Sequence, residues 1–240
     1  MKCVHCLTEL NEKTKDHVFP TSWYPDTTPS EVQRWTVPSC ARCNGTLGRI
    51  EKELFVRLAL GADPTRAEAS GMSKTALRSL GIGVGNLTPK EKAHRTALAK
   101  KVLMKVKPLK EHGEIGLLPG FGPHPGSPAG EQLVLNIPED VLKSVAEKIV
   151  RGCEFKLNGG AYIEHPLHTK IYFVHDRGAK DLTAFFERLS VTTLGPGFEV
   201  RRGQAPPEEG EQIVLYRITI WGTLRIYASI DIEEAFKKAP

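Results

Sequence analysis

The sequence has no long apolar run. Its 240 residues are 40% hydrophobic and 7% aromatic, and no stretch approaches the roughly 18 consecutive apolar residues that a membrane-spanning helix needs. The first residues, Met1-Lys2-Cys3, also lack the apolar core of a secretory signal. We therefore expect a soluble globular protein of the cytoplasm that contacts no membrane and keeps its thiols reduced.

Acidic residues are scarce in one part of the chain. Residues 1–120 hold 19 Lys and Arg against 12 Asp and Glu, whereas residues 121–240 hold 14 against 16. Between Lys74 and Lys110 the only acid among ten basic side chains is Glu91. This surplus favours contact with a polyanion, because each phosphate that is neutralised releases counterions. A solvated helix face is the simpler alternative.

Cysteine is sparse as well, and four of the five cysteines form two Cys-x-x-Cys pairs, Cys3/Cys6 and Cys40/Cys43. In a reducing compartment such pairs indicate a metal site rather than disulfides. Four thiolates complete the tetrahedral shell of structural Zn²⁺ and leave no position open for a substrate. We therefore expect His5, between the first two cysteines, to be exposed, and the lone Cys153 to be a buried apolar side chain.

Helical periodicity follows the second cysteine pair. Leu47, Ile50, Leu54 and Leu58 recur at helical spacing, and Gly61 supplies a stop. A second, basic helix is predicted from Thr88, where Pro89 and Glu91 complete the signals of a capped start, to a point before Pro108.

The second half of the chain has a different pattern. Residues 117–130 are rich in Pro and Gly and predict a linker. Beyond them, a strand over 132–137 and a helix from Pro138 to Gly152 are followed by a strand, a helix and a hairpin around Trp221-Gly222-Thr223. This order predicts one sheet covered by two or three helices.

The expected fold class is α+β. We divide the chain into a zinc-containing N-terminal module (1–60), a basic helical segment (61–116), a linker (117–130) and a C-terminal α+β sheet domain (131–240).

Asp16 and His17 lie side by side between the cysteine pairs, and Asn44 directly follows the last cysteine. A carboxylate and an amide oxygen suit Mg²⁺, and a neutral imidazole suits a general base. These residue types are those that a metal-dependent nuclease requires. The alternative is a zinc module in which an adjacent Asp and His occur by chance.

The motifs CVHC (3–6), DHVFP (16–20) and CARCN (40–44) together resemble the zinc-containing branch of the HNH endonucleases over residues 1–60. The resemblance implies a ββα-metal (treble-clef) fold, with the DH pair on a β-hairpin, a helix after CxxCN lying across it, and zinc beneath. It also implies that Asp16 and Asn44 ligate a catalytic Mg²⁺ or Mn²⁺ and that His17 activates the attacking water.

Two features depart from that family. Residues 18–39 contain no Asn to orient His17, so Gln33, Arg34 or Trp35 is expected in its neighbourhood. Leu47 and Gly48 stand where many members carry a His. Glu51 and Glu53, on the helix that follows, could help to bind the cation, but we expect them to face solvent.

The sequence thus predicts a metal-dependent endonuclease acting on DNA, with RNA as an alternative substrate. The competing hypothesis is a zinc-stabilised module that binds nucleic acid or protein without catalysis. Cuts on both strands would call for two sites and hence a homodimer. The basic residues expected to contact the nucleic-acid backbone are Arg42, Arg49, Arg57, Lys90, Lys92, Arg95, Lys100, Lys101 and Lys105.

Overall fold

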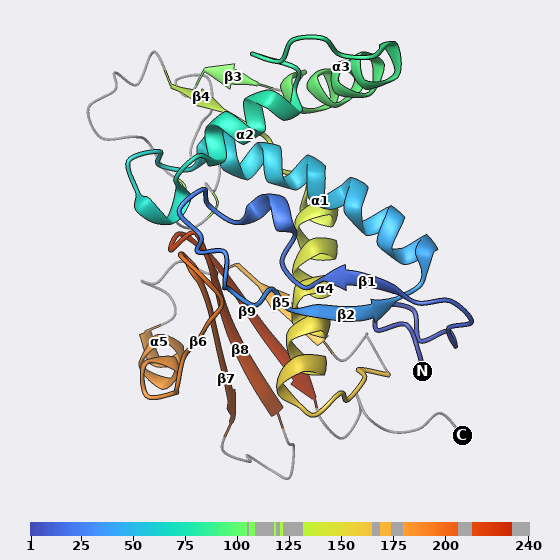
Figure 1. Ribbon diagram of the computed structural model, residues 1–240. Helices are drawn as coiled ribbons and strands as arrows, with labels where there is room; N and C mark the ends of the chain where they lie inside the picture. Colours follow the sequence, from blue (N-terminus) through green and yellow to red (C-terminus); the bar gives the residue numbers. More distant parts are fainter. Residues whose placement is uncertain are drawn as a thin grey trace.

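The structure is a computed structural model that describes residues 1–104, 106–108, 118, 121, 132–164, 169–173, 180–205 and 213–231. Helices and strands are mixed, and the largest sheet is five-stranded and antiparallel (Figure 1). The α+β class predicted from the sequence is confirmed at this level. No helix of the described part is long and apolar enough to cross a bilayer.

The N-terminal segment forms a two-stranded unit followed by a helix. Strand β1 (Thr14–His17) pairs antiparallel with β2 (Thr36–Ser39), and Asp16 lies opposite Val37. Helix α1 (Ala41–Gly61) begins one residue after β2. Its first turn is capped by Cys40, whose Sγ accepts a hydrogen bond from the Cys43 backbone N–H. The helix predicted from the second cysteine pair to Gly61 is confirmed.

Two further helices pack above α1 in Figure 1. Helix α2 (Met72–Ser79) packs on α1, and α3 (Pro89–Leu103) begins with the predicted capping box of Thr88 and Glu91. The helix ends at Leu103, five residues before Pro108. Single 3₁₀ turns occupy Thr21–Trp23 and Ala67–Ala69. The predicted strand over 132–137 is limited to β4 (Leu133–Val134), which pairs with β3 (Lys107–Pro108) away from the main sheet.

The main sheet has the strand order β5-β9-β8-β7-β6. The predicted hairpin around residues 221–223 is confirmed, and its turn places both Trp221 and Gly222 at positive φ. The strands are β5 (Thr169–Tyr172), β6 (Thr192–Thr193), β7 (Phe198–Gln204), β8 (Ile213–Ile220) and β9 (Leu224–Asp231).

Helices α4 (Glu139–Leu157) and α5 (Lys180–Glu187) cover opposite faces of this sheet. Glu154 of α4 bonds Arg202 and Tyr216, which are opposite one another on β7 and β8. The neighbouring register pair, Arg201 and Arg217, points the other way and contacts α5.

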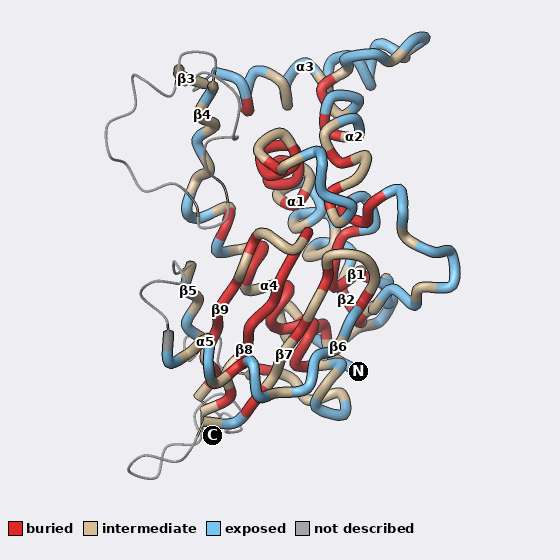
Figure 2. The backbone as a smooth tube through the Cα atoms, turned by 90° about the vertical axis from the view of Figure 1, so that its left-hand side faces the viewer, coloured by how far each residue is buried: buried red, intermediate tan, exposed pale blue. Residues whose placement is uncertain are grey.

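One buried core joins the N-terminal segment to the sheet. The rings of Phe19 and Tyr24 pack on Phe198 of β7, at centroid distances of 5.0 and 4.6 Å. The Trp221 indole lies 5.8 Å from Trp23 and donates a hydrogen bond to its carbonyl. Buried residues therefore run without interruption from α1 through α4 to the strands (Figure 2). The segments that we divided by sequence are packed together in the described residues.

Helix α4 lies between β1-β2 and the sheet (Figure 1). It does not end at Gly152 as predicted, but continues to Leu157. A Cβ at residue 152 would lie 2.8 Å from Val18 Cγ2 and 2.9 Å from Cγ1. Gly152 is therefore a contact point for the strand segment rather than a helix stop.

The predicted linker over 117–130 lies outside the described residues except for Leu118 and Phe121. Both side chains pack against the core. Lys105 also lies outside the described residues.

Gly152→Ala is expected to destabilise the protein by about 1–3 kcal/mol, because Val18 is fully buried and stiff and cannot yield to the added methyl group. Urea unfolding of the metal-loaded protein measures the change. Gly48→Ala is the matched control, since the added Cβ meets nothing within 4 Å, and a helix-interior glycine gains about 0.5–1 kcal/mol on conversion to alanine. Equal effects of the two changes would contradict the contact.

Candidate functional site

The four cysteines of the two pairs come together at the start of α1. Their Sγ atoms all lie within 4.8 Å of one another, and those of Cys6 and Cys40 are 3.8 Å apart. Tetrahedral zinc with Zn–S bonds of about 2.3 Å requires S···S separations of about 3.8 Å. The cluster is therefore positioned to bind one metal ion and is compatible with structural zinc. Cys153 is fully buried elsewhere, as predicted.

Local hydrogen bonds hold this cluster together. The Cys3 Sγ accepts from the Cys40 N–H at 3.4 Å, which ties the two pairs together. A hydrogen bond with the Thr8 hydroxyl lowers the pKa of Cys6 to about 6, which favours the thiolate that a metal needs.

The side chain of His5 is buried, and the prediction that it would be exposed is wrong. Its side chain is 6% exposed, and Nε2 lies 2.7 Å from Oδ2 of Asp16. The cysteine cluster determines this position, because His5 stands between Cys3 and Cys6, and strand β1 with Asp16 runs alongside. Asp16 is buried too, so this pair is shielded from water.

Lys148 of α4 contacts the other oxygen of Asp16. Its Nζ lies 3.5 Å from Asp16 Oδ1 and 2.6 Å from Glu51 Oε1 of α1, and the side chain is only 1% exposed. The same ammonium group donates to the backbone carbonyls of His17 and Val18. One buried cation thus connects β1, α1 and α4.

The pKa values of the two carboxylates next to Lys148 are shifted in opposite directions. Burial tends to raise the pKa of Asp16, but the hydrogen bond from His5 and the charge of Lys148 outweigh it and lower that pKa overall. For Glu51 burial prevails over the attraction of Lys148, and its pKa is raised. Asp16 is therefore the firmly ionised partner of Lys148.

The prediction that Glu51 and Glu53 would face solvent is also wrong. Glu53 is buried and pairs with Arg57 at 3.0 Å and with Lys101 at 2.5 Å. Arg57 donates to the backbone carbonyl of Lys101 at 2.9 Å. Because Arg57 is buried and paired with Glu53, its side chain is not at the surface, where the predicted contact with a nucleic acid would require it.

His17 lies at the end of β1 and is half-buried. Burial lowers its pKa, Asp16 opposes that effect, and Lys148 and Arg34 add to it. The backbone at His17 is anchored on both sides. Lys148 binds the His17 carbonyl from one side, and the next N–H, of Val18, donates to the Trp35 carbonyl at 2.9 Å.

Asn44 lies close to the same strand, and its side-chain N–H donates to Thr14 Oγ1 at 3.1 Å. Asp16 and His17 thus lie at one end of β1, whereas Asn44 contacts Thr14 at the other end, three residues before His17. A divalent cation does not fit this arrangement of Asp16, because His5 and Lys148 engage its two oxygens. Among the described residues, only the four cysteines form a group of three or more Cys, His, Asp or Glu side chains able to share an ion.

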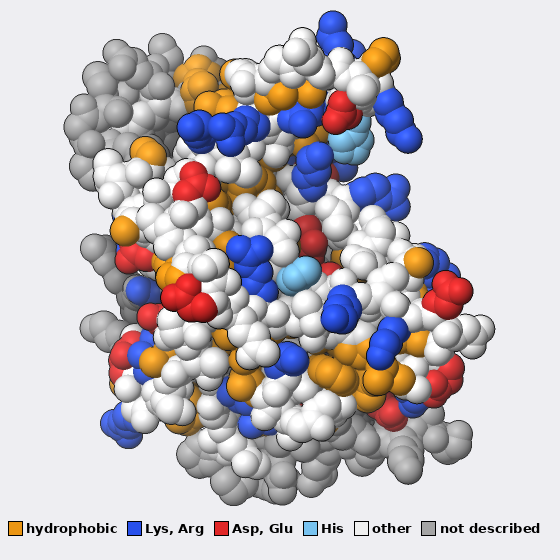
Figure 3. Space-filling view, in the orientation of Figure 1, with side chains coloured by type: hydrophobic (Ala, Val, Ile, Leu, Met, Phe, Trp, Pro, Cys, Tyr) orange, Lys and Arg blue, Asp and Glu red, His pale blue; other side chains and the backbone are white. Residues whose placement is uncertain are grey.

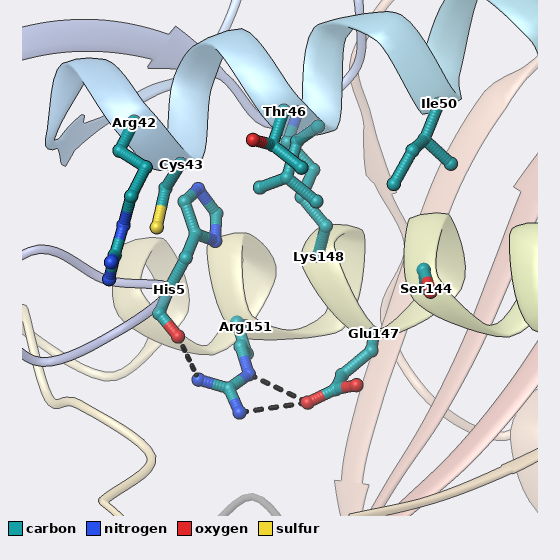
Figure 4. A pocket seen from close by; sticks show the side chains of 10 residues that line it. His5, Arg42, Cys43, Thr46, Ile50, Ser144, Glu147, Lys148 and Arg151 are labelled. Atoms are coloured by element: carbon teal, nitrogen blue, oxygen red, sulfur yellow. Dashed lines mark hydrogen bonds and ion pairs between the residues drawn. The ribbon is translucent and has the colours of Figure 1, made fainter.

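A cavity of about 360 Å³ opens between α1 and α4, and His5, Cys43 and Lys148 are among the residues that line it. The His5 ring projects between the two helices, and Arg151 closes the lower wall by bonding the His5 carbonyl and Glu147 (Figure 4). The apolar lining comes from Leu47 and Ile50.

Most of the other predicted phosphate contacts lie at the surface. Lys and Arg side chains gather over α2 and α3 (Figure 3). Arg95 is partly buried and donates to the Arg78 carbonyl. Of the basic residues predicted to contact phosphate, those that are exposed are Arg42, Arg49, Lys90, Lys92, Lys100 and Lys101.

Sequence reasoning missed Lys148, Glu51 and His5. The signal for Lys148 was present, because it lies within the apolar stripe formed by Val145 and Ile149, where a lysine requires a buried partner. Glu51 and His5 had no such signal, since their burial depends on α4 docking against the N-terminal segment.

No family model, no curated protein and no solved structure matches this chain.

The cysteine cluster is expected to hold about one equivalent of zinc, since four thiolates complete one shell. Elemental analysis should show the metal lost in Cys40→Ser and retained in Cys153→Ala, a cysteine outside the cluster. Chelation should also unfold the N-terminal segment, because metal binding and folding are coupled. A Cys40→Ser protein with a full equivalent of zinc would contradict the assignment.

Proposed function

We propose that the protein is an endonuclease that hydrolyses phosphodiester bonds in DNA, with His17 as the base that activates water. The observation that carries this proposal is the frame around His17. Strand β1, which carries Asp16 and His17, pairs with β2, and β2 leads directly into the second cysteine pair and α1. This is the order of elements that the HNH resemblance implies, with the cysteine cluster as its structural zinc site.

The surroundings of His17 suit a general base. Because burial and two nearby cations lower its pKa, the imidazole is neutral at physiological pH and can accept a proton from water. The resulting hydroxide would attack phosphorus in line with the leaving 3′ oxygen, whose bond to phosphorus breaks while that oxygen takes a proton from water. His17 as a whole is only half-buried, as a residue that meets a substrate must be.

Arg34 is the cation best placed to meet the phosphate that is cleaved. It is exposed, its charge acts on His17, and its guanidinium lies 4.8 Å from the centroid of the Tyr24 ring. The exposed lysines of α3 would bind the backbone further along the duplex. Such contacts position the nucleic acid without reading its sequence.

The Mg²⁺ or Mn²⁺ that the resemblance implies has no step in this proposal, since Lys148 and His5 occupy its predicted ligand Asp16. That same observation favours the second candidate, a zinc-stabilised module that binds nucleic acid without cutting it. A reducing compartment such as the cytoplasm would keep the thiols able to bind metal. A homodimer would supply the two sites that a double-strand break requires.

Purified zinc-loaded protein should nick supercoiled plasmid with or without added Mg²⁺ or Mn²⁺, and His17→Ala should reduce the rate by about 10²–10⁴-fold, the usual contribution of a general base. His94→Ala is the matched control, because His94 is exposed on α3. Gel-shift binding is measured on the same samples. Nicking that survives in His17→Ala would exclude the proposed base, and DNA binding without nicking would support the second candidate.

A further inference from the structure

The buried ammonium group of Lys148 stands where a nuclease of this type would need a metal ion. It lies between the Asp16 and Glu51 carboxylates, at 3.5 and 2.6 Å. It also donates hydrogen bonds to the backbone carbonyl oxygens of His17 and Val18. Carboxylate and carbonyl oxygens are the ligands that hard cations such as Mg²⁺ and Mn²⁺ prefer. The protein therefore directs a cation-binding set of oxygens at a lysine.

Lys148 and a divalent ion compete for this place. An ion bound to Asp16 Oδ1 at about 2.1 Å would lie no more than about 6 Å from the ammonium nitrogen. The two positive charges would then repel in a region from which water is largely excluded, where repulsion is poorly screened. The second oxygen of Asp16 offers no alternative, because His5 Nε2 lies 2.7 Å from it.

Packing holds Lys148 in position. Its neighbours on α4, Val145 and Ile149, are buried in the common core, and Gly152 lets the helix approach Val18 closely. Arg151, one turn further along the same side, bonds the His5 carbonyl at 2.8 Å. Lys148 could leave the carboxylates in two ways. Either α4 would separate from the N-terminal segment, or the amine would stay buried without a partner, which is costly.

We infer that Lys148 is the resident cation of the Asp16–Glu51 site, so that the docked helix α4 excludes a divalent ion from Asp16. Removing the lysine charge exposes a divalent-cation site formed by these two carboxylates. The N-terminal segment on its own supplies the ligands, and the C-terminal half of the chain decides whether a metal can reach them.

Mn²⁺ binding to the zinc-loaded full chain tests this inference, with free Mn²⁺ followed by electron paramagnetic resonance. Wild-type protein and Asp16→Asn should bind Mn²⁺ equally weakly. Lys148→Met should bind Mn²⁺ at least about tenfold more tightly, because a nearby positive charge is gone. The gain should disappear in Lys148→Met/Asp16→Asn. Lys143→Met is the matched control, since that lysine is exposed on the same helix.

Mn²⁺ binding by the wild-type protein that Asp16→Asn removes would overturn the inference, and so would a folded Lys148→Met protein that gains no binding. Zinc content and circular dichroism establish folding of each variant. If Lys148→Met does not fold, the comparison of wild type with Asp16→Asn still decides. Binding and cleavage are separate readouts, so the failure of the proposed nuclease activity is distinguishable from the failure of this inference.

Discussion

The contact of the Lys148 ammonium group with Asp16 is the interaction on which the arrangement of this site depends. The ammonium group binds β1 through the Asp16 carboxylate and two backbone carbonyls, and it also pairs with Glu51 on α1. Lys148 itself lies on α4, the helix that packs against the sheet. A charge buried to this extent is tolerated only when it is paired. Removing one partner of such a pair typically costs about 3–5 kcal/mol, because the other is left uncompensated. The positions of His17, α1 and α4 are therefore coupled.

The cysteine cluster and Lys148 both help to position strand β1, from two sides. The cysteines fix the start of α1 and place His5 beside Asp16, while α4 brings Lys148 to the opposite oxygen. The result is a corner in which a neutral, half-buried imidazole stands next to exposed Arg34. Zinc would thus organise the site without taking part in chemistry, and the carboxylate would serve to position side chains.

Much of the local structure follows from the sequence alone. The cysteine spacing, the capping signals of α3, the apolar stripe of α1 and the hairpin at Trp221 are determined by residues close together in the chain, and each is confirmed. What failed depends on contacts between distant segments. Gly152 looks like a helix stop until Val18 is placed against it, and Arg57 and Glu51 look like solvent-facing charges until their partners arrive. The motifs place Asp16 and His17 on a strand beside the cysteine pairs, but they carry no information about the helix that packs against that strand.

A double-mutant cycle between Asp16 and Lys148 tests the central claim most directly. Urea unfolding of the zinc-loaded wild type, Asp16→Asn, Lys148→Met and the double variant gives their coupling energy. If the buried contact organises the site, the two single losses should together exceed the loss in the double variant by more than about 1 kcal/mol. Losses that add to within about 0.5 kcal/mol would show that the two groups do not interact, and the account of the site would then be wrong.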